Sequence, residues 1–427
     1  LDERKTQYEG TLDQLYNKDF REFIVHNRQD TMLIYKLDKK LRFLDLANEL
    51  AHDNTVLLQT TMGAVAVTEQ AIINEAHQLG LVVPNRKGKD EQGDTQAAGA
   101  YVAYPKKGMH DWVGAIDINS LYPSAIRALN MGPETIVGQL RPIMTDRYIA
   151  EKMSSGSSFA DAWENMFGTL EYTAVMENQV GTEITIDRED GNSTLHSAAE
   201  VWRLIFDSNQ PWTLSANGTI FSYERKGVVP GLLERWYAER KEMQAKKKDA
   251  ENDEDKAFWD KRQLVKKINL NSLYGAILNP GCRFFDKRIG QSTTLTGRII
   301  ARHMDAYINE CIFGKYDHVG DAIIYGDTDS CYFTAWPAVK EEVAAGRMEW
   351  NKETCVQLYD TIAEQVNASF PAFMERACHC PRSMGSLIKG GRELVAETGL
   401  YIKKKRYAVL IYDLEGNRLD TYGKPGK

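Results

Sequence analysis

The chain has 427 residues, 43% of them hydrophobic and 26% charged, a balance typical of a globular chain large enough for two or three domains. No apolar run reaches the roughly 18 residues that span a membrane, and no signal peptide opens the chain, so the composition excludes a membrane protein and predicts a cytoplasmic one. The net charge of −7 is unusual for a nucleic-acid-binding protein, but basic clusters at 246–248, 266–267 and 403–406 show that the charges are segregated.

The first segment that suggests chemistry is 112–124. Residues 112–116 are mostly apolar and predict a buried strand, with Asp117 at its end. Pro123 suits the first turn of a helix that continues through Arg127. Asp117 is therefore expected at a strand-to-helix corner, where free backbone N–H groups can bind phosphate.

A helical hairpin is predicted further along the chain. Residues 232–248 have helical spacing, the polar stretch 249–255 is a plausible tip, and 266–275 is again helical. Lys267, Asn271 and Tyr274 fall at i, i+4 and i+7, on one face of the second helix. Arg240 and Lys267 are nearly equidistant from the tip, so they are expected to stand level and to form a clamp suited to a triphosphate. A solvated face of a charged hairpin is the alternative.

The tight turn at 325–330, Tyr-Gly-Asp-Thr-Asp-Ser, joins the apolar runs 322–324 and 331–333. Strand alternation would send Asp327 and Asp329 to the same side, which suits a hard divalent cation such as Mg²⁺. An Asp-rich surface turn is the alternative. If the Asp117 corner abuts this turn, three carboxylates converge, enough for two cations about 3.5–4 Å apart that clamp a phosphoryl displacement.

Taken together, these segments resemble the polymerase motifs of family B DNA polymerases, in particular those of the T-even-like phage replicative type. The matches are Asp-Ile-Asn-Ser-Leu-Tyr-Pro-Ser at 117–124, Lys-x3-Asn-Ser-x-Tyr-Gly at 267–275 and Tyr-Gly-Asp-Thr-Asp-Ser at 325–330, in the family's order. Lys-Lys-Lys-Arg-Tyr at 403–407 resembles the family's later Lys-Lys-Arg-Tyr element. The resemblance implies an α+β architecture, with a palm on a mainly antiparallel sheet and a helical hairpin as the fingers.

The resemblance also implies a function, which is template-directed DNA synthesis in replication. Deoxynucleotidyl groups would pass from dNTPs to a primer 3′-hydroxyl on primer–template DNA, with a sliding clamp among the partners. Asp117 and Asp329 match carboxylates that bridge two Mg²⁺ ions, for which Mn²⁺ can substitute. Asp327 matches an auxiliary catalytic carboxylate, and the Ile118 carbonyl matches a further metal ligand. Glu393 matches another acidic residue only if the alignment contains a gap.

The remaining matches concern the nucleotide and the DNA. The residues that contact the incoming nucleotide are Ser120, Leu121, Tyr122, Arg240, Lys267, Asn271 and Tyr274. Among them, Tyr122 matches the steric gate whose ring excludes a ribose 2′-OH. The residues matched to DNA contacts are Gly275, beside the nascent base pair, and Lys404, Lys405, Arg406 and Tyr407, at the primer end of the duplex.

The chain also departs from the family pattern. Gln244 stands where the family usually has a lysine, and 141–210 is long enough to indicate an insertion. His26 to Asp30 resembles the last of three proofreading exonuclease segments, with Asp30 as its carboxylate; the other two would lie upstream of the chain. The implied organisation is an exonuclease remnant (1–60), a linker (61–112), a first palm part (113–229), fingers (230–280) and a second palm part (281–427) that ends before the thumb.

Two alternatives to a self-sufficient DNA polymerase follow from these departures. The first is one part of a split polymerase, or a fragment, inactive without exonuclease and thumb parts that a companion chain would supply. The second is a different palm enzyme, such as an RNA-synthesising polymerase or a nucleotide cyclase. Tyr122 argues against RNA synthesis, and the helix with Lys267 and Asn271 argues against a cyclase. If the chain is phage-encoded, its location would be the host cell cytoplasm.

Overall fold

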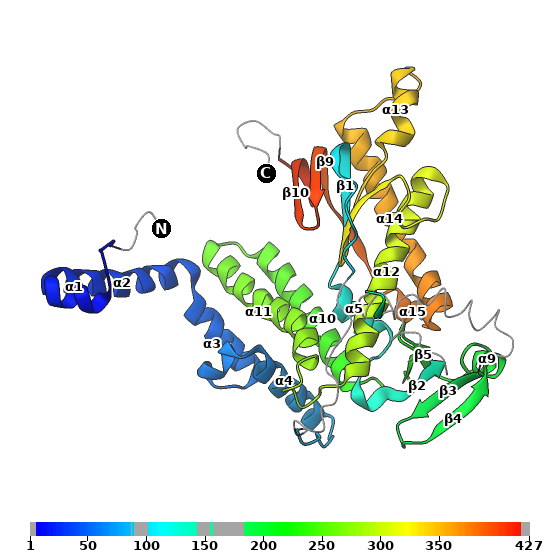
Figure 1. Ribbon diagram of the computed structural model, residues 1–427, viewed down its shortest axis with the longest axis horizontal. Coiled ribbons are helices and arrows are strands. Elements are labelled where there is room, and N and C mark those ends of the chain that lie inside the picture. Colours follow the sequence, from blue (N-terminus) through cyan, green and yellow to red (C-terminus); the bar gives the residue numbers. More distant parts are fainter. Residues whose placement is uncertain (1–5, 87, 89–100, 143–153, 157–182, 420–427) are drawn as a thin grey trace.

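A six-stranded antiparallel sheet forms the centre of the molecule (Figure 1). The computed structural model describes residues 6–86, 88, 101–142, 154–156 and 183–419. The strands, in the order in which they lie in the sheet, are β11 (Asn417–Arg418), β10 (Arg406–Leu414), β9 (Gly390–Lys403), β1 (Gly108–Ile118), β8 (Ser330–Thr334) and β7 (Ile323–Asp327). With the helices described below, this sheet confirms the α+β class, and β1 has a paired strand on each side.

Side chains pack on both faces of the central strand β1, which explains why its residues 113–116 are all buried. The long helices α12 (Lys287–Phe313) and α14 (Lys352–Cys378) pack on one face, where Ile116 and Phe333 meet Tyr359. On the opposite face, Val113 and Ala115 pack with a group of buried tyrosines: Tyr325, Tyr332 and Tyr401. The short helices α13 (Trp336–Ala344) and α15 (Arg382–Gly385) flank α14.

A second, five-stranded antiparallel sheet lies apart from the first, at the lower right of Figure 1. Its order is β4 (Ser193–Ser197), β3 (Glu183–Arg188), β2 (Ile136–Pro142), β6 (Thr219–Ser222) and β5 (Trp212–Leu214). Helix α9 (Ala198–Trp202) and the π-helical turn Arg203–Asp207 complete a small core that includes Ile184, Val201 and Ile220. The described part of the predicted insertion at 141–210 therefore contributes the end of β2, β3 and β4 to this sheet, while its residues 143–153 and 157–182 lie outside the described residues.

The predicted helical hairpin is present as α10 (Val228–Asp249) and α11 (Asp253–Ile277). The connection is only three residues long, because Asn252 caps α11 by accepting a 2.8 Å hydrogen bond from the Asp255 N–H. Acidic residues fill the first turn of α11 and lysines the last turn of α10, and both arrangements are favoured by the helix dipoles. The tip thus lies at 250–252, inside the polar stretch that predicted it.

The N-terminal part of the chain is helical. Its elements are α1 (Leu12–Lys18), α2 (Phe20–Leu41), α3 (Phe43–Asn54), the 3₁₀ turn Leu58–Met62 and α4 (Ala64–Gln78). Helices α3 and α4 pack against α11, whereas α1 and α2 project away from the rest of the molecule (Figure 1). Large apolar side chains on α2 are therefore exposed, for example Phe20 (55%) and Ile34 (70%). Among the helices of the described ranges, none combines the length and apolarity that a membrane crossing requires.

A buried cation joins the N-terminal helices to the hairpin. The Lys266 ammonium, on α11, lies 2.5 Å from an Asp53 oxygen on α3 and 2.6 Å from a Glu239 oxygen on α10, and its side chain is only 6% exposed. The second Asp53 oxygen accepts a 2.9 Å hydrogen bond from the Asn269 amide. Arg235 of α10 adds a 2.5 Å ion pair to Glu75 of α4. Charge pairing as well as apolar packing thus holds the hairpin against α3 and α4.

Lys266→Met should lower the free energy of unfolding by about 3 kcal/mol, because it leaves Asp53 and Glu239 without their shared cation in a partly buried position. Urea denaturation followed by circular dichroism measures the loss. Lys248→Met, which removes an exposed lysine from the same hairpin, should cost about 0.5 kcal/mol or less. Equal losses in the two variants would show that the buried ion pairs do not stabilise this interface.

Candidate active site

The corner after β1 is tied directly to the turn that carries the two other aspartates. The Ile118 N–H donates a 2.8 Å hydrogen bond to the Asp329 carbonyl, and Asp117 is paired with Ser330 of β8. The chain then turns at Ser120, which has a φ of 51°, and α5 (Leu121–Ala128) begins. Asp117 and Asp329, which are far apart in the sequence, therefore lie next to each other, as the sequence analysis anticipated.

Asp327 and Asp329 are separated by a turn. Asp327 is the last residue of β7, Thr328 has a φ of 61°, and the Asp329 N–H donates a 2.7 Å hydrogen bond back to the Asp327 carbonyl. Strand alternation therefore does not govern the two side chains, contrary to the sequence argument. Asp327 accepts a 3.2 Å hydrogen bond from the Tyr325 hydroxyl and lies 3.4 Å from the Lys405 ammonium. Asp327 thus has a cationic partner within the protein.

Two glutamates complete the acidic group. The pairing of β1 with β9 shifts between Ala115 and Ile116, so Glu393 is a bulge residue without a partner on β1. The Glu415 N–H donates a 2.7 Å hydrogen bond to the Glu393 carbonyl, which places Glu415 beside it. The sequence analysis missed Glu415, because its only signal is its position across the β9–β10 hairpin.

These carboxylates repel one another. Burial, and then the charges of Asp329, Glu393 and Glu415, raise the pKa of Asp117 to about 7. Burial is also the main reason that the pKa of Asp329 is raised, and the charge of Asp327 adds to the increase. Burial, Glu415 and Asp329 raise the pKa of Glu393. A bound cation would neutralise these partly buried carboxylates and so relieve their repulsion. Carboxylate oxygens are also the ligands that a hard divalent cation prefers.

The side chains do not form a closed cage. Within the described ranges, no three His, Cys, Asp or Glu side chains lie close enough together to hold a metal ion. Asp117, Asp329 and the Ile118 carbonyl fit a divalent cation through their charge and chemistry. Such an open arrangement is compatible with an ion that keeps several waters and is also bound by substrate phosphates.

Next to this acidic group, two tyrosines stack. The rings of Tyr122, on α5, and Tyr274, on α11, have centroids 4.4 Å apart and are tilted by 33°. The Tyr274 hydroxyl lies 2.7 Å from the Thr294 hydroxyl of α12. Three other predicted residues on α11 are exposed along one face of the helix: Lys267, Asn271 and Gly275.

Contrary to the sequence analysis, Arg240 and Lys267 do not stand level. Lys267 lies about one helical turn further from the hairpin tip than Arg240 does. The Arg240 Nε donates a 3.4 Å hydrogen bond to Gln263, which precedes Lys267 by four residues on α11. The tip at 250–252 is earlier in the chain than the sequence analysis assumed, which shifts the pairing of the two helices. Arg240 is half-buried, and burial lowers its pKa. Gln244 lies one turn further towards the tip.

The predicted DNA-contacting residues 404–407 form the tip of the β9–β10 hairpin and the start of β10. Lys405 has a φ of 59°, and its N–H donates a 3.0 Å hydrogen bond to the Tyr325 hydroxyl. The Lys404 ammonium lies 4.0 Å from the centre of the Tyr104 ring, and the Tyr407 hydroxyl lies 2.7 Å from that of Tyr332. The basic hairpin tip is therefore fastened to the acidic turn, with Arg406 at the first position of β10.

Asp30 is not part of this site. It lies on α2, which projects away from the sheet (Figure 1), and its Oδ2 is 3.6 Å from the His26 Nε2. The two residues that resemble an exonuclease segment are thus neighbours on one helix, one turn apart.

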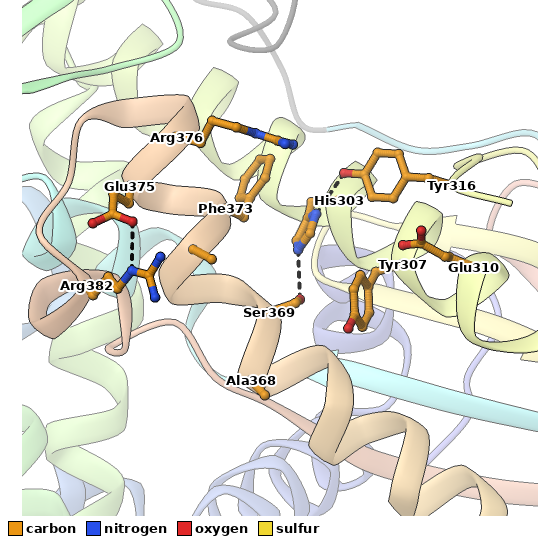
Figure 2. Close-up of a pocket in the computed structure, with 11 residues that line it drawn as sticks. His303, Tyr307, Glu310, Tyr316, Ala368, Ser369, Phe373, Glu375, Arg376 and Arg382 are labelled. Atoms are coloured by element: carbon orange, nitrogen blue, oxygen red, sulfur yellow. Dashed lines mark hydrogen bonds and ion pairs between the residues drawn. The ribbon is translucent and has the colours of Figure 1, made fainter. Parts of the chain in front are cut away.

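A separate pocket lies between α12 and α14 (Figure 2). His303 at its base is hydrogen-bonded to the Tyr316 and Ser369 hydroxyls and stacked on Phe373, with ring centroids 4.1 Å apart. Burial lowers the pKa of His303 to about 3, so the ring is neutral near pH 7. None of the predicted site residues lines this pocket.

Comparison with known proteins identifies the family to which this fold and site belong. Residues 55–361 match the family model described as DNA polymerase family B, and the chain belongs to that family. It is 24% identical to the DNA-directed DNA polymerase of Escherichia phage RB69, with 99% of this chain and 47% of the relative covered. It is also 24% identical to the DNA-directed DNA polymerase of Enterobacteria phage T4, covering 97% and 46%.

A third viral relative matches a shorter stretch of the chain. The DNA polymerase of Paramecium bursaria Chlorella virus NY2A is 30% identical over 312 residues, covering 71% of this chain and 27% of the relative. The chain thus spans less than half the length of each of these three relatives.

The raised pKa of Asp117 predicts a change in stability. In its folded environment the carboxyl ionises near pH 7, above its ordinary value of 3.8, so its charge opposes folding increasingly as pH rises from about 4 to 7. In metal-free buffer at about pH 8, Asp117→Asn removes this charge and should raise the free energy of unfolding by about 1–2 kcal/mol. The gain is limited to this size because solvent screens part of the repulsion.

Thermal unfolding with EDTA at several pH values measures this effect. The gain should disappear below about pH 4, where the carboxyl is protonated in both states. Asp111→Asn, at an exposed position of the same strand, is the matched control and should change stability little. A variant that is no more stable than the wild type at about pH 8 would contradict the crowding of carboxylates.

Proposed function

We propose that this chain is the palm-and-fingers part of a DNA polymerase, which transfers a deoxynucleotidyl group from a dNTP to a primer 3′-hydroxyl and releases pyrophosphate. The observation that carries this proposal is the backbone contact between Ile118 and Asp329, which joins the Asp117 corner to the Asp327 turn. Membership of DNA polymerase family B supports DNA synthesis as the reaction. In this assignment, residues 230–280 are the fingers, and 113–229 and 281–427 form the palm.

Asp117 and Asp329 would hold two divalent cations, with the Ile118 carbonyl as a further ligand. Mg²⁺ is the proposed ion, and Mn²⁺ is a suitable substitute because it accepts the same oxygen ligands. When bound, the ions would supply Lewis-acid stabilisation of the charge that develops on the phosphoryl oxygens and the leaving group. Asp327 is already partnered by Lys405, so its proposed role is auxiliary.

The residues around the acidic group would position the substrates. Backbone N–H groups of Ser120 and Leu121, at the start of α5, would receive the triphosphate. The exposed cation of Lys267, with Arg240 and Asn271, would bind the phosphates from the α11 side. Tyr122 would exclude the ribose 2′-OH. Residues assigned to the nascent base pair and the primer–template duplex are Tyr274, Gly275, Lys404, Lys405, Arg406 and Tyr407.

A second proposal is that this chain acts only together with other polymerase parts. The exposed apolar side chains on α2, such as Phe20 and Ile34, are a surface that a further protein segment could cover. A companion part that carries exonuclease segments would also supply the carboxylates that Asp30 needs for proofreading. A sliding clamp is a further proposed partner, and the host cytoplasm is the proposed location if a phage encodes the chain.

Asp117→Asn and Asp329→Asn should each reduce single-turnover primer extension by about 10³-fold or more, because each removes a charge that neutralises cations at the reacting phosphate. Asp327→Asn should reduce extension less, because Lys405 already neutralises part of the Asp327 charge. Asp321→Asn, an exposed acidic residue just before β7, is the matched control and should leave the rate unchanged.

The same assay separates the two proposals. Near-normal extension by the Asp329→Asn variant would contradict the assignment of the metal site. If the wild-type chain extends a primer only after separate exonuclease and thumb segments of a relative are added, the second proposal is supported. No extension under either condition would contradict both.

Lys267→Ala should weaken dNTP use by roughly 10- to 150-fold, because a hydrogen bond between charged groups contributes about 1.5–3 kcal/mol. Gln244→Lys should strengthen dNTP use, because it restores the lysine that the family usually has at this position. The dependence of the single-turnover rate on dNTP concentration measures both changes. Lys248→Ala, near the hairpin tip, is the control and should have no effect; an unchanged dependence in Lys267→Ala would support a merely solvated hairpin face.

A further inference from the structure

The ring of Tyr122 packs against helix α12 at a position that has no side chain. Gly297 lies within α12, and a Cβ atom added to it would lie 2.9 Å from Tyr122 Cε1 and 3.2 Å from Tyr122 Cδ1. The same atom would lie 3.3 Å from Leu121 Cδ2. A contact of 2.9 Å is shorter than real Cβ atoms show, so the ring packs directly on the bare backbone of α12.

The local backbone does not require glycine at this position. Gly297 is in an ordinary helical conformation, with α12 continuing for more than two turns on each side. Glycine destabilises a helix interior relative to alanine, so local stability favours alanine here. The close approach of Tyr122 and Leu121 is therefore the physical reason that a side chain does not fit.

A second contact links the Tyr122 ring to α12, through Tyr274. Tyr274 stacks on Tyr122 at 4.4 Å, and its hydroxyl reaches Thr294. The Thr294 hydroxyl donates its proton to the Gly290 carbonyl at 2.7 Å, so Tyr274 is the donor in the contact with Thr294. Thr294 and Gly297 are three residues apart and share one face of α12. This face thus supports both rings.

We propose that Gly297 is a specificity-determining positioning residue. Its missing side chain sets the depth of the Tyr122 ring and therefore the space left for the sugar of the incoming nucleotide. This proposal rests on the proposed function, in which Tyr122 excludes a ribose 2′-OH. A Cβ at residue 297 would push the ring away from α12, towards the nucleotide.

The test measures equilibrium binding of dATP and ATP to the chain with primer–template DNA, using a dideoxy-terminated primer and a template thymine. Gly297→Ala should weaken dATP binding about fivefold and ATP binding several-fold more, so that the preference for dATP increases. In a Tyr122→Ala background, Gly297→Ala should change neither affinity by more than about twofold, because no ring remains to be displaced. Tyr122→Phe keeps the ring and should preserve the effect of Gly297→Ala.

Gly231→Ala is the matched control. This residue lies within α10, where an added Cβ would make only an ordinary 3.5 Å contact with Lys226 Cγ, so both affinities should be unchanged. Two results would overturn the proposal: unchanged binding in Gly297→Ala, or an equal effect with and without the Tyr122 ring, which would indicate general packing of α5 on α12. If the wild type and Tyr122→Ala show the same dATP preference, the steric-gate role of Tyr122 within the proposed function fails.

Folding is checked by the melting temperature. If Gly297→Ala alone does not fold, the double variant with Tyr122→Ala decides the question. Recovery of the melting temperature after removal of the ring supports the direct contact between residues 122 and 297. A double variant as unstable as the single one would overturn it.

Discussion

The pairing of β1 on both sides is the constraint on which the rest of the site depends. Antiparallel hydrogen bonds join its end to β8 and β9, so the Asp117 carboxyl lies beside Asp329 and close to Glu393. Backbone pairing thereby holds together carboxylates that repel one another, and burial together with this repulsion raises the pKa of Asp117. The apolar faces of the sheet supply the stability that makes this crowding tolerable.

Charges of opposite sign are arranged around this acidic centre. Lys405, at the tip of the β9–β10 hairpin, pairs with Asp327 and also donates its N–H to the Tyr325 hydroxyl. The buried Tyr325 side chain thus connects the basic tip to the acidic turn through a hydrogen bond on each side. Local segregation of charge, rather than the net charge of −7, therefore determines what this surface attracts.

Besides covering the sheet, the helices position the side chains and the hairpin around the acidic centre. Helix α12 packs on β7 and β8 and also supports the rings of Tyr122 and Tyr274, so the core of the sheet and the proposed nucleotide pocket share one helix. Helix α3 holds the α10–α11 hairpin through the buried ammonium of Lys266, and α4 holds it through the ion pair between Glu75 and Arg235. The position of the hairpin is thus coupled to the N-terminal part of the chain.

The sequence by itself determined the strand that ends near Asp117, the tip of the helical hairpin and the order of the family motifs, because apolar periodicity, capping residues and turn residues act locally. The resemblance to the family, rather than any local pattern, implied that Asp117 and Asp329 meet. Only the tertiary structure decided that Glu415 joins them and that Arg240 lies one turn away from Lys267. Strand register and helix packing determine these contacts, and neither follows from spacing along the chain.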